Sequence, residues 1–339
     1  MMSAHPLSKT RRRNMPENAC RAVIVRPMAP EDYDRFVALH NLVYPTRPRT
    51  LEEVREADRK RDSKYAAGRW AAFVDDQMVG FAGYAQWTGE GHATWFQVNV
   101  VVDEPFRRQG IGTSLYARLF EEMTQHDPKV LRADAYENLP AGLRFALILG
   151  FKDVFREGPS HLDLEPFDAT PFAPLLERLE REGIEFLSYA EYRERNGGFS
   201  EPLYAAYCDA WKDVPKEEES EISRDDWQEW VLEGSQLSFE ISTVALSGDQ
   251  IVGFCEVGSA AKGRPVHAGL AGVARPERKR GIATAAYVKA IEAAQHRGHP
   301  QMQTSSGIEN VAMQTVYSKL GFVREPVWIQ LERRLRELD

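Results

Sequence analysis

Hydrophobic and polar residues follow two periodicities along this chain, and their order predicts the elements of the fold. Short runs rich in β-branched and aromatic residues predict strands, and apolar residues at every third or fourth position predict helices. In the first half these patterns place strands at 21–25, 69–74, 78–87, 94–102 and 130–135, helices at 29–43, 109–124 and 140–149, and two closing strands after Gly150. Strands and helices alternate from an antiparallel start, which indicates a mixed α+β (mixed α/β) fold.

The second half of the chain repeats this order of elements. Strands are expected at 238–246, 250–257, 267–273 and 301–305, helices at 281–297 and 310–320, and further strands after Gly321. A chain of 339 residues is long for one domain and of ordinary length for two. The pattern therefore predicts two domains with the same succession of elements.

Three sequence blocks recur in the same order in both halves. The recurring pairs are Asp76–Phe81 with Asp249–Phe254, Val102–Gly112 with Val273–Ala283, and Leu149–Phe151 with Leu320–Phe322. From Arg107 to Gly150 is 43 residues, and the same 43 residues separate Arg278 from Gly321. A single short block could match by chance, but three blocks in order, two of them at equal separation, indicate a tandem duplication.

The duplication predicts where the domains begin and end. We expect an N-terminal domain at 21–166 and a C-terminal domain at 167–339, preceded by a flexible tail at 1–20. The tail holds an arginine triplet at 11–13 without a following apolar run, so it lacks the pattern of a secretory signal. No stretch approaches the roughly 18 apolar residues of a membrane-spanning helix. A cytoplasmic protein without a membrane partner is therefore expected.

Composition narrows the classes of partner. Hydrophobic residues make up 43% and charged residues 28% of the chain, which is enough apolar material for two cores. The 43 Lys and Arg against 51 Asp and Glu give a net charge of −8, which disfavours nucleic acid as a partner. An acidic protein attracts cations to its clefts, and an amine substrate is such a cation. Cys20, Cys208 and Cys255 form no C-x-x-C pair, and no H-E-x-x-H occurs, so no metal site is expected.

A glycine-containing turn follows a predicted strand in each copy and begins a helix. The first turns of a helix have unpaired backbone N–H groups and a partial positive charge, so a helix N-terminus binds phosphate well. Glycine lets the backbone approach such an anion closely because it has no Cβ. The first turn lacks the third glycine of G-x-G-x-x-G, and no Gly-Lys-Ser/Thr of a Walker loop is present. These two other nucleotide-binding motifs are therefore excluded.

An apolar strand ending in Val, a Pro-containing turn and Arg-x-x-Gly-x-Gly/Ala at a helix start resemble motif A of the GNAT superfamily of acyl-CoA-dependent N-acyltransferases. The later helix ending in Leu-Gly-Phe resembles motif B of the same superfamily. The resemblance covers about 21–165 and 184–335. Two such domains in one chain are similar to the arrangement in tandem acetyltransferases of the mycothiol synthase type. The resemblance implies two GNAT-like domains, each a twisted, mostly antiparallel sheet flanked by helices.

The resemblance also implies that acetyl-CoA is the acyl donor and that the loops bind its pyrophosphate through backbone amides. The expected cofactor-binding residues of the first copy are Val102, Arg107, Arg108, Gln109, Gly110, Ile111 and Gly112. Those of the second copy are Val273, Arg278, Lys279, Arg280, Gly281, Ile282, Ala283 and Asn310. We expect binding at the second loop at least, and at both loops in the fuller form of this hypothesis.

Acyl transfer to an amine requires a base for the ammonium proton, donors for the thioester oxygen and a donor for the departing thiolate. In the family the last donor is often a Tyr four residues before the motif-B glycine, and that position is Tyr317 in the second copy. The first copy has Ala146 there, which donates nothing. A phenol with a pKa of about 10 loses its proton uphill to a thiolate whose acid has a pKa of about 8.5. Hydrogen-bond donation is therefore expected to be most of the role.

The candidate base lies on the strand that ends in the motif-A Val, six positions before it, where relatives have Glu or a similar group. That position is His267 in the second copy and Phe96 in the first. An imidazole with a pKa near 6.5 can accept a proton near neutral pH. Glu256 on the neighbouring strand is the alternative base. The first copy lacks the Tyr and the His, so we expect it to bind coenzyme without catalysing transfer.

The acceptor pocket is expected to be formed by helices within 201–234. Tyr204, Tyr207 and Trp211 fall on one helical face there, which predicts that they pack in the core. The sequence thus predicts an N-acetyltransferase that transfers acetyl from acetyl-CoA to the amine of a small molecule in its C-terminal domain. A non-catalytic acyl-CoA binding or sensor protein and a protein N-acetyltransferase remain as alternatives. The acceptor, the acyl length and the oligomeric state are left open.

Overall fold

The computed structural model describes residues 22–45, 48–87, 93–198, 201–214, 221–233 and 237–335. The chain divides into two compact units. One comprises residues 1–133 with 333–339, and the other comprises residues 134–332. The flexible tail predicted at 1–20 lies outside the described residues.

The first unit contains an antiparallel sheet that gains a parallel strand at one side. Its strands pair in the order β1 (Ile24–Pro27), β2 (Ala67–Val74), β3 (Gln77–Gln86), β4 (Trp95–Val102) and β5 (Val130–Tyr136). Its helices are α1 (Tyr33–Val43), α2 (Leu51–Lys60) and α3 (Ile111–Met123). β4 and β5 run parallel to one another, and the other neighbouring strands run antiparallel.

The second unit contains a larger sheet with the same parallel pair inside it. Its strands pair in the order β13 (Trp328–Arg334), β6 (Lys152–Asp163), β11 (Gln301–Gly307), β10 (Val266–Val273), β9 (Gln250–Val257), β8 (Thr243–Ser247) and β7 (Ile184–Ser188), with β12 (Val323–Arg324) beside β6. Its helices are α4 (Pro140–Ile148), α5 (Ala173–Arg181), α6 (Tyr189–Asn196), α7 (Glu201–Lys212), α8 (Arg224–Asp226) with the π-helical Trp227–Glu233, α9 (Ile282–His296) and α10 (Val311–Leu320). β10 and β11 are its parallel neighbours. The mixed α+β class and the mostly antiparallel sheets are therefore confirmed.

Strand β6 belongs to the first sequence copy but lies in the sheet of the second unit, between β13 and β11. The compact units therefore divide the chain differently from the sequence copies, whose boundary was placed at residue 166. β6 is one strand of 12 residues, which corrects the two closing strands expected after Gly150. It stays continuous because β13 pairs with its first half and β11 with its second half.

The strand expected to begin at residue 238 begins at Thr243 instead. Residues 238–242 form a hydrogen-bonded turn, in which the N–H groups of Ile241 and Ser242 both donate to the carbonyl oxygen of Ser238. The hydrophobic residues at this turn resemble a strand in the sequence pattern because both are packed in the core: Leu237 packs with Val244 and Leu246 of β8, and Ile241 packs in the cluster beneath α9.

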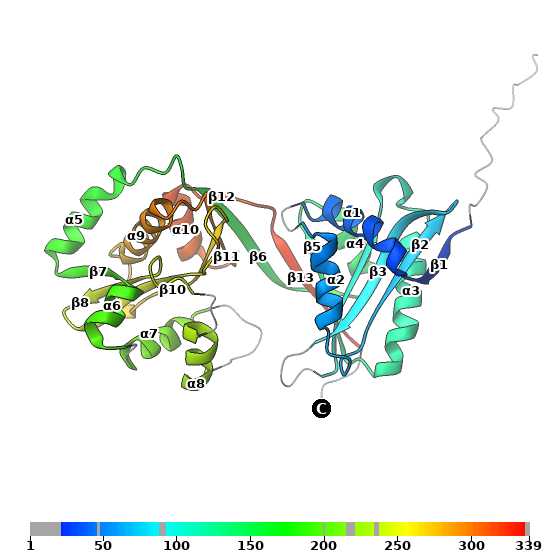
Figure 1. Cartoon of the computed structure of the whole chain (residues 1–339), viewed down its shortest axis with the longest axis horizontal. Helices are drawn as coiled ribbons and strands as arrows, with labels where there is room; N and C mark the ends of the chain where they lie inside the picture. The colour runs from blue at the N-terminus through cyan, green and yellow to red at the C-terminus, as the bar shows by residue number, and fades with distance from the viewer. Residues whose placement is uncertain are drawn as a thin grey trace, which may run out of the picture. The chain divides into compact units, whose positions relative to one another are not determined.

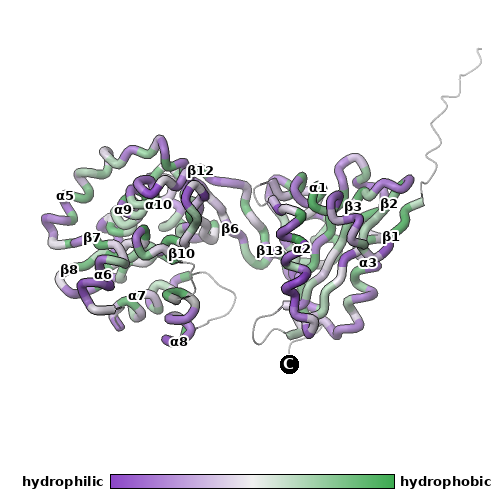
Figure 2. Tube along the Cα trace, in the orientation of Figure 1, coloured by the Kyte–Doolittle hydropathy of each residue, from purple (hydrophilic) through white to green (hydrophobic). Residues whose placement is uncertain are grey.

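Helices cover both faces of the sheet in the second unit. Figure 1 shows α5 and α9 on one side and α6 and α7 on the other. Side chains of β9 alternate between these layers. Cys255 therefore packs with buried residues of α9, and Phe254 packs with buried residues of α7. Figure 2 shows the contrast between the hydrophobic strands and α2, which is hydrophilic along nearly its whole length. Within the described ranges, no helix combines the length and apolar character needed to cross a bilayer.

Glycine at the repeated positions Gly80 and Gly253 allows a helix to rest closely on the sheet. A Cβ on Gly80 would lie 2.7 Å from the carbonyl oxygen of Val101 and 3.2 Å from Cδ1 of Leu115 in α3. A Cβ on Gly253 would lie 2.8 Å from Cγ2 of Ile282 in α9. In both copies this contact seats the helix that follows the glycine-containing turn.

We expect Gly253→Ala to lower the free energy of unfolding by about 1–3 kcal/mol, because the added methyl overpacks the contact with Ile282. The matched control is Gly142→Ala in α4, where an added Cβ meets nothing within 4 Å. That control should be neutral or stabilising by up to about 1 kcal/mol. Calorimetric melting of both variants measures the difference, and equal melting temperatures would contradict the packing argument.

Candidate active site

The parallel strands β10 and β11 pair at one end and separate at the other. Their ladder begins with Val266 opposite Met302 and ends with Ala268 opposite Thr304. β10 continues for five more residues to Val273, and β11 continues to Gly307. The two strands therefore bound a wedge that begins at Ala268 and Thr304. β4 and β5 show the same behaviour in the first unit, where pairing ends at Gln97 and Arg132.

A β-bulge lies beside the wedge in the second unit. Ala268 pairs with Val257 and Ala271 pairs with Cys255, so two residues of β10 lie opposite Glu256. A bulge of this kind bends its strand and changes where neighbouring backbone groups point. The corresponding β3–β4 ladder runs from Gly80 to Gln86 without a shift of register. The wedge and the bulge thus occur together in the second copy.

The two glycine-containing turns have the same backbone conformation. Arg108 and Lys279 both have φ 65°, and the glycines that follow, Gly110 and Gly281, have φ 82° and 91°. Each glycine is the N-cap of its helix and supplies no side chain to the first N–H groups. These groups therefore remain available to an anion. The repeated sequence has produced a repeated anion-binding geometry.

The first arginine of each turn clamps the turn to its strand. Nε of Arg107 donates to the carbonyl oxygen of Val102 at 3.0 Å, and Nε of Arg278 donates to that of Val273 at 3.0 Å. This places Val102 and Val273, two predicted cofactor-binding positions, at the base of the loop. The arginines set the shape of the turn through these bonds, in addition to their charge.

The charges around the second turn are paired with carboxylates of the same unit. Arg278 forms an ion pair with Asp213, and Arg280 forms ion pairs with Glu182 and Glu277. The ion pair with Arg280 holds the pKa of Glu182 below its usual value. In the part of the first unit that the structure describes, no ion pair is formed by Arg107 or Arg108. The two turns therefore differ in how their arginines are paired, although their backbones agree.

Helix α5 lies against the second turn and has no counterpart in the predictions from sequence. Nη2 of Arg178 donates to the carbonyl oxygen of Arg280 at 2.6 Å. A Cβ on Gly281 would lie only 2.8 Å from Cδ1 of Leu175. A Cβ on Gly110 would meet nothing within 4 Å. The second turn is thus partly covered and the first is open. Amphipathic spacing of Leu175, Leu176 and Leu179 was the sequence signal for this helix.

The other predicted cofactor-binding residues take different positions. Ile111 and Ile282 are buried and anchor the helices, so only their backbone faces the turn. Gly112 and Ala283 follow them in the first turn of α3 and α9. The side chain of Gln109 donates back to the carbonyl oxygen of Pro105 at 3.2 Å. Asn310 caps α10 by accepting from the N–H of Met313 at 3.2 Å.

Tyr317 lies at the point where β10 and β11 separate. Its side chain is 3% exposed, and its hydroxyl is 3.1 Å from the hydroxyl of Thr304. Thr304 also donates to the carbonyl oxygen of Ala268 at 3.1 Å, so these groups join α10 to both strands at the start of the wedge. Burial raises the pKa of Tyr317, and the hydrogen bond with Thr304 partly opposes that shift. At neutral pH the phenol is therefore protonated and able to donate.

Glu256 is a buried carboxyl group on β9, opposite the bulge. It is 6% exposed, and burial raises its pKa to about 8. The Tyr189 hydroxyl of α6 donates to its Oε1 at 3.5 Å, a weak hydrogen bond that only partly offsets this shift. A carboxyl group with such a pKa exchanges its proton in the range where amines are also titrated. Tyr189 was not predicted, because nothing in the sequence links α6 to β9.

His267, the first candidate base, lies on β10 opposite Gln303 and is exposed at the surface. It shares a face of the sheet with Glu256, because side chains of Val266 and Ala268 point to the α9 side. The structure thus brings Glu256 next to the bulge and Tyr317 to the start of the wedge. His267 lies in the paired part of β10, one residue before Ala268, and is therefore outside the wedge.

The first copy has none of these three side chains at the matching positions. Ala146 replaces Tyr317 and is buried, and Phe96 replaces His267 and packs against Tyr84. Glu256 is three residues after Gly253, and three residues after Gly80 comes Gly83. The first copy therefore retains the glycine-containing turn and lacks these three side chains at the matching positions.

A cleft of about 530 Å³ opens between α7 and the ends of β9 and β10. It lies on the α7 face of the sheet and reaches Val273 and Ala274 beside the second turn. Asp209 of α7 and Asp249 contribute acidic side chains to its lining. Tyr207 is buried, and Tyr204 and Trp211 are partly buried beside it, as the helical pattern predicted. The helix expected to form an acceptor pocket thus provides one wall of a cleft.

Comparisons with known proteins agree with this architecture. In solved structures, a GCN5-related N-acetyltransferase from Sphaerobacter thermophilus matches 93% of this chain and 96% of its own, with 18% identity and a TM-score of 0.66. A tandem GNAT protein from the clavulanic acid biosynthesis pathway matches 94% and 100%, with 19% identity and a TM-score of 0.58. A glucosamine N-acetyltransferase region of a fungal β-N-acetylglucosaminidase matches 92% of this chain and 38% of that one, with 14% identity and a TM-score of 0.61. These likenesses establish the fold.

Sequence comparison establishes the family. No curated protein sequence matches this chain. The pattern of the Acetyltransferase (GNAT) family, however, matches residues 34–151 and 201–322, which together exceed half of the chain. Each match contains one of the two turns and one of the two motif-B helices. The chain therefore belongs to the GNAT family of acetyltransferases and carries two copies of its domain.

Proposed function

We propose that this protein is an N-acetyltransferase that transfers acetyl from acetyl-CoA to the amine of a small molecule, with the chemistry in its C-terminal domain. One observation carries the proposal. The wedge between β10 and β11 has the Tyr317 hydroxyl at its start, a bulge beside it opposite Glu256, and an anion-binding turn beyond its open end. Acetyl-CoA bound along β10 would need these features in this order, with the turn at its pyrophosphate and the bulge and Tyr317 at its thioester.

The second turn has the features needed to hold the pyrophosphate of acetyl-CoA. Gly281 in the left-handed conformation begins α9, and the N–H groups of Ile282 and Ala283 are among the unpaired groups of its first turn. Lys279 adds positive charge beside them, and Arg178, which forms an ion pair with Glu182, holds the turn through the carbonyl oxygen of Arg280. When bound, acetyl-CoA supplies an acetyl group activated as a thioester. The open ends of β10 and β11 offer unpaired backbone groups along which its pantetheine arm would lie.

Glu256 is our candidate for the group that accepts the proton of the acceptor ammonium, in place of His267. Two observations support it: Glu256 is buried opposite the bulge, and its pKa is about 8, within reach of an ammonium group. The amine nitrogen, once deprotonated, forms a bond to the acetyl carbon while the carbon–sulfur bond breaks. The nitrogen loses its second proton as the amide forms, and this proton balances the departing thiolate. Tyr317 donates a hydrogen bond to the sulfur, or gives it its own proton and recovers one from the nitrogen.

A small amine fits the surroundings better than a polypeptide. The cleft beside α7 is lined by Asp209 and Asp249, which would attract a cation. Its volume of about 530 Å³ is that of a site for a small molecule. A fungal relative in fold bears the name of a glucosamine N-acetyltransferase region, which is consistent with an amine of this size. Net charge −8 also disfavours nucleic acid as the acceptor.

Titration of the protein with acetyl-CoA tests the loop assignment. Ala283→Asp adds a carboxylate to the first turn of α9, where it favours the helix but repels a pyrophosphate. We expect at least a tenfold weaker affinity for acetyl-CoA by isothermal titration calorimetry and an unchanged melting temperature. Gly112→Asp is the matched change in α3, and loss of a second binding event there would locate a site in the first copy. Full affinity in Ala283→Asp would place the coenzyme elsewhere.

Tyr317→Phe should lower kcat by about 100-fold while the affinity for acetyl-CoA stays the same, because the donor to sulfur is lost and the ring is retained. The assay is release of free thiol from acetyl-CoA with a panel of amines such as glucosamine, spermidine and 2-phenylethylamine, and with a peptide N-terminus. Tyr84→Phe, a buried phenol of the first unit, is the control. Binding without thiol release from any acceptor would support a sensor, and acetylation of the peptide alone would support a protein acetyltransferase.

The activity should rise with pH through about 8 as Glu256 loses its proton, because only the carboxylate can accept a proton from the acceptor. Glu256→Gln should lose this limb of the profile and lower kcat/KM for the amine by about 100-fold. Because the folded pKa lies above the unfolded one, ionised Glu256 destabilises the fold as pH rises from about 4.5 to 8. Glu256→Gln should therefore gain more in Tm at pH 8.5 than at pH 5. An unchanged pH profile would contradict the role of Glu256.

A further inference from the structure

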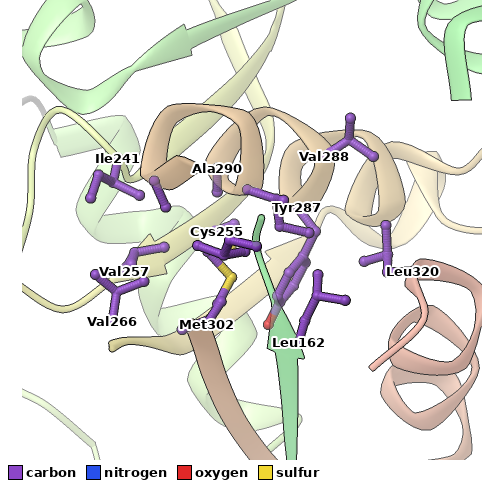
Figure 3. Packing of buried hydrophobic residues seen from close by; sticks show 14 of the residues in the cluster. Leu162, Ile241, Cys255, Val257, Val266, Tyr287, Val288, Ala290, Met302 and Leu320 are labelled. Atoms are coloured by element: carbon purple, nitrogen blue, oxygen red, sulfur yellow. The ribbon is translucent and has the colours of Figure 1, made fainter. Parts of the chain in front are cut away.

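Tyr287 has a fully buried hydroxyl group that the chemistry described above does not use. It lies in α9, six residues after Gly281, and its side chain is 0% exposed. Figure 3 shows it extending from the helix into the core near Met302 and Leu162. Among the described residues, its oxygen is one of the few buried polar atoms without a hydrogen-bond partner.

A buried hydroxyl without a partner costs stability. Removing such a group from water without a new hydrogen bond is unfavourable, because its hydrogen bonds with water are lost and not replaced. The matching residue of the first copy is Tyr116, six residues after Gly110, and its hydroxyl accepts a hydrogen bond from Nη1 of Arg333 at 2.9 Å. The same side chain is thus satisfied in the copy without Tyr317 and unsatisfied in the copy that contains it. Packing alone would be served equally well by Phe at position 287.

The Tyr287 hydroxyl is close to the polar atoms at the start of the wedge. Its ring meets that of Tyr317 edge to face, with 5.8 Å between centroids. Cys255, Thr304 and Tyr317 all perturb its pKa, which burial raises far above its usual value. Tyr287 in turn lowers the pKa of Tyr317, as a donor to the Tyr317 oxygen would. A short movement of either ring would therefore make a hydrogen bond between the two phenols.

The number of hydroxyl protons at this point gives the bond a direction. Thr304 has one proton, and the carbonyl oxygen of Ala268 is an acceptor for it at 3.1 Å. Tyr317 has one proton, which is needed for the sulfur. If Tyr317 were to donate to Thr304 instead, its proton would point away from the wedge. A donor to the Tyr317 oxygen favours the arrangement in which Thr304 donates to Ala268 and Tyr317 keeps its proton for the sulfur. Tyr287 is the group with an uncommitted proton.

We propose that Tyr287 is a positioning residue that donates a hydrogen bond to the Tyr317 oxygen in the loaded enzyme and so directs the Tyr317 proton toward the leaving sulfur. The proposal rests on the proposed role of Tyr317 as that donor. The unpaired hydroxyl of the free protein is then a group held ready for the loaded state. This unpaired hydroxyl lowers the stability of the free protein and raises the rate of acetyl transfer.

Tyr287→Phe separates this role from packing. The substitution keeps the ring and removes an unsatisfied hydroxyl, so we expect Tm to stay the same or rise. We expect kcat for thiol release with an accepted amine to fall five- to tenfold, and KM for acetyl-CoA to stay unchanged. Tyr116→Phe is the matched control: it removes a satisfied hydroxyl in the first copy, so it should lower Tm and leave kcat unchanged. Unchanged kcat in Tyr287→Phe would overturn the proposal.

A double-mutant cycle provides a readout that packing would not affect. In the Tyr317→Phe background there is no proton to direct, so adding Tyr287→Phe should leave kcat where Tyr317→Phe alone put it. Independent effects that multiply in the double variant would overturn the positioning role. If Tyr317→Phe itself has no effect on kcat, the proposed function of Tyr317 fails first. If Tyr317→Phe is slow and Tyr287→Phe is not, the further inference alone fails.

Discussion

The separation of β10 from β11 after three paired residues is the constraint on which the rest of the second unit depends. Strands that part inside a sheet leave backbone groups without ladder partners, which a protein tolerates only where something else can satisfy them. The sheet keeps its integrity because each strand is held at its other edge, β10 by β9 and β11 by β6 from Gln301 to Gly307. β6 comes from the first sequence copy, so the duplication supplies part of the support for the opening.

The two copies share the glycine-containing turn but not the side chains that we propose for proton transfer. The turns agree in backbone angles, in the arginine clamp and in the close glycine contact beneath the helix. All of these depend on local sequence, which the duplication preserved. The side chains proposed for proton transfer, Glu256 and Tyr317, come from β9 and α10, and the first copy has Gly83 and Ala146 at the matching positions. Retention of the turn without the chemistry is therefore the easier outcome for a duplicated domain.

The second unit carries two buried polar groups that a core built for stability alone would avoid. Glu256 has its pKa raised by burial, and the Tyr287 hydroxyl has no partner among the described residues. Both lie beside the wedge, on opposite faces of the sheet. Conflicts between packing and polarity concentrate at functional sites because the surrounding core is stable enough to hold them. The proposed function places the chemistry of the second copy beside both of these groups.

The sequence by itself determined the duplication, the mixed α+β class, the two turns and the absence of Tyr from the motif-B helix of the first copy. These depend on residues close together in the chain, and short-range pattern reveals them. Only the tertiary structure decided that β6 lies in the sheet of the second unit, that α5 covers the second turn, that Glu256 is buried opposite the bulge, and that Tyr287 is buried beside Tyr317. These depend on contacts between distant segments, and no local periodicity records which strand will lie beside which.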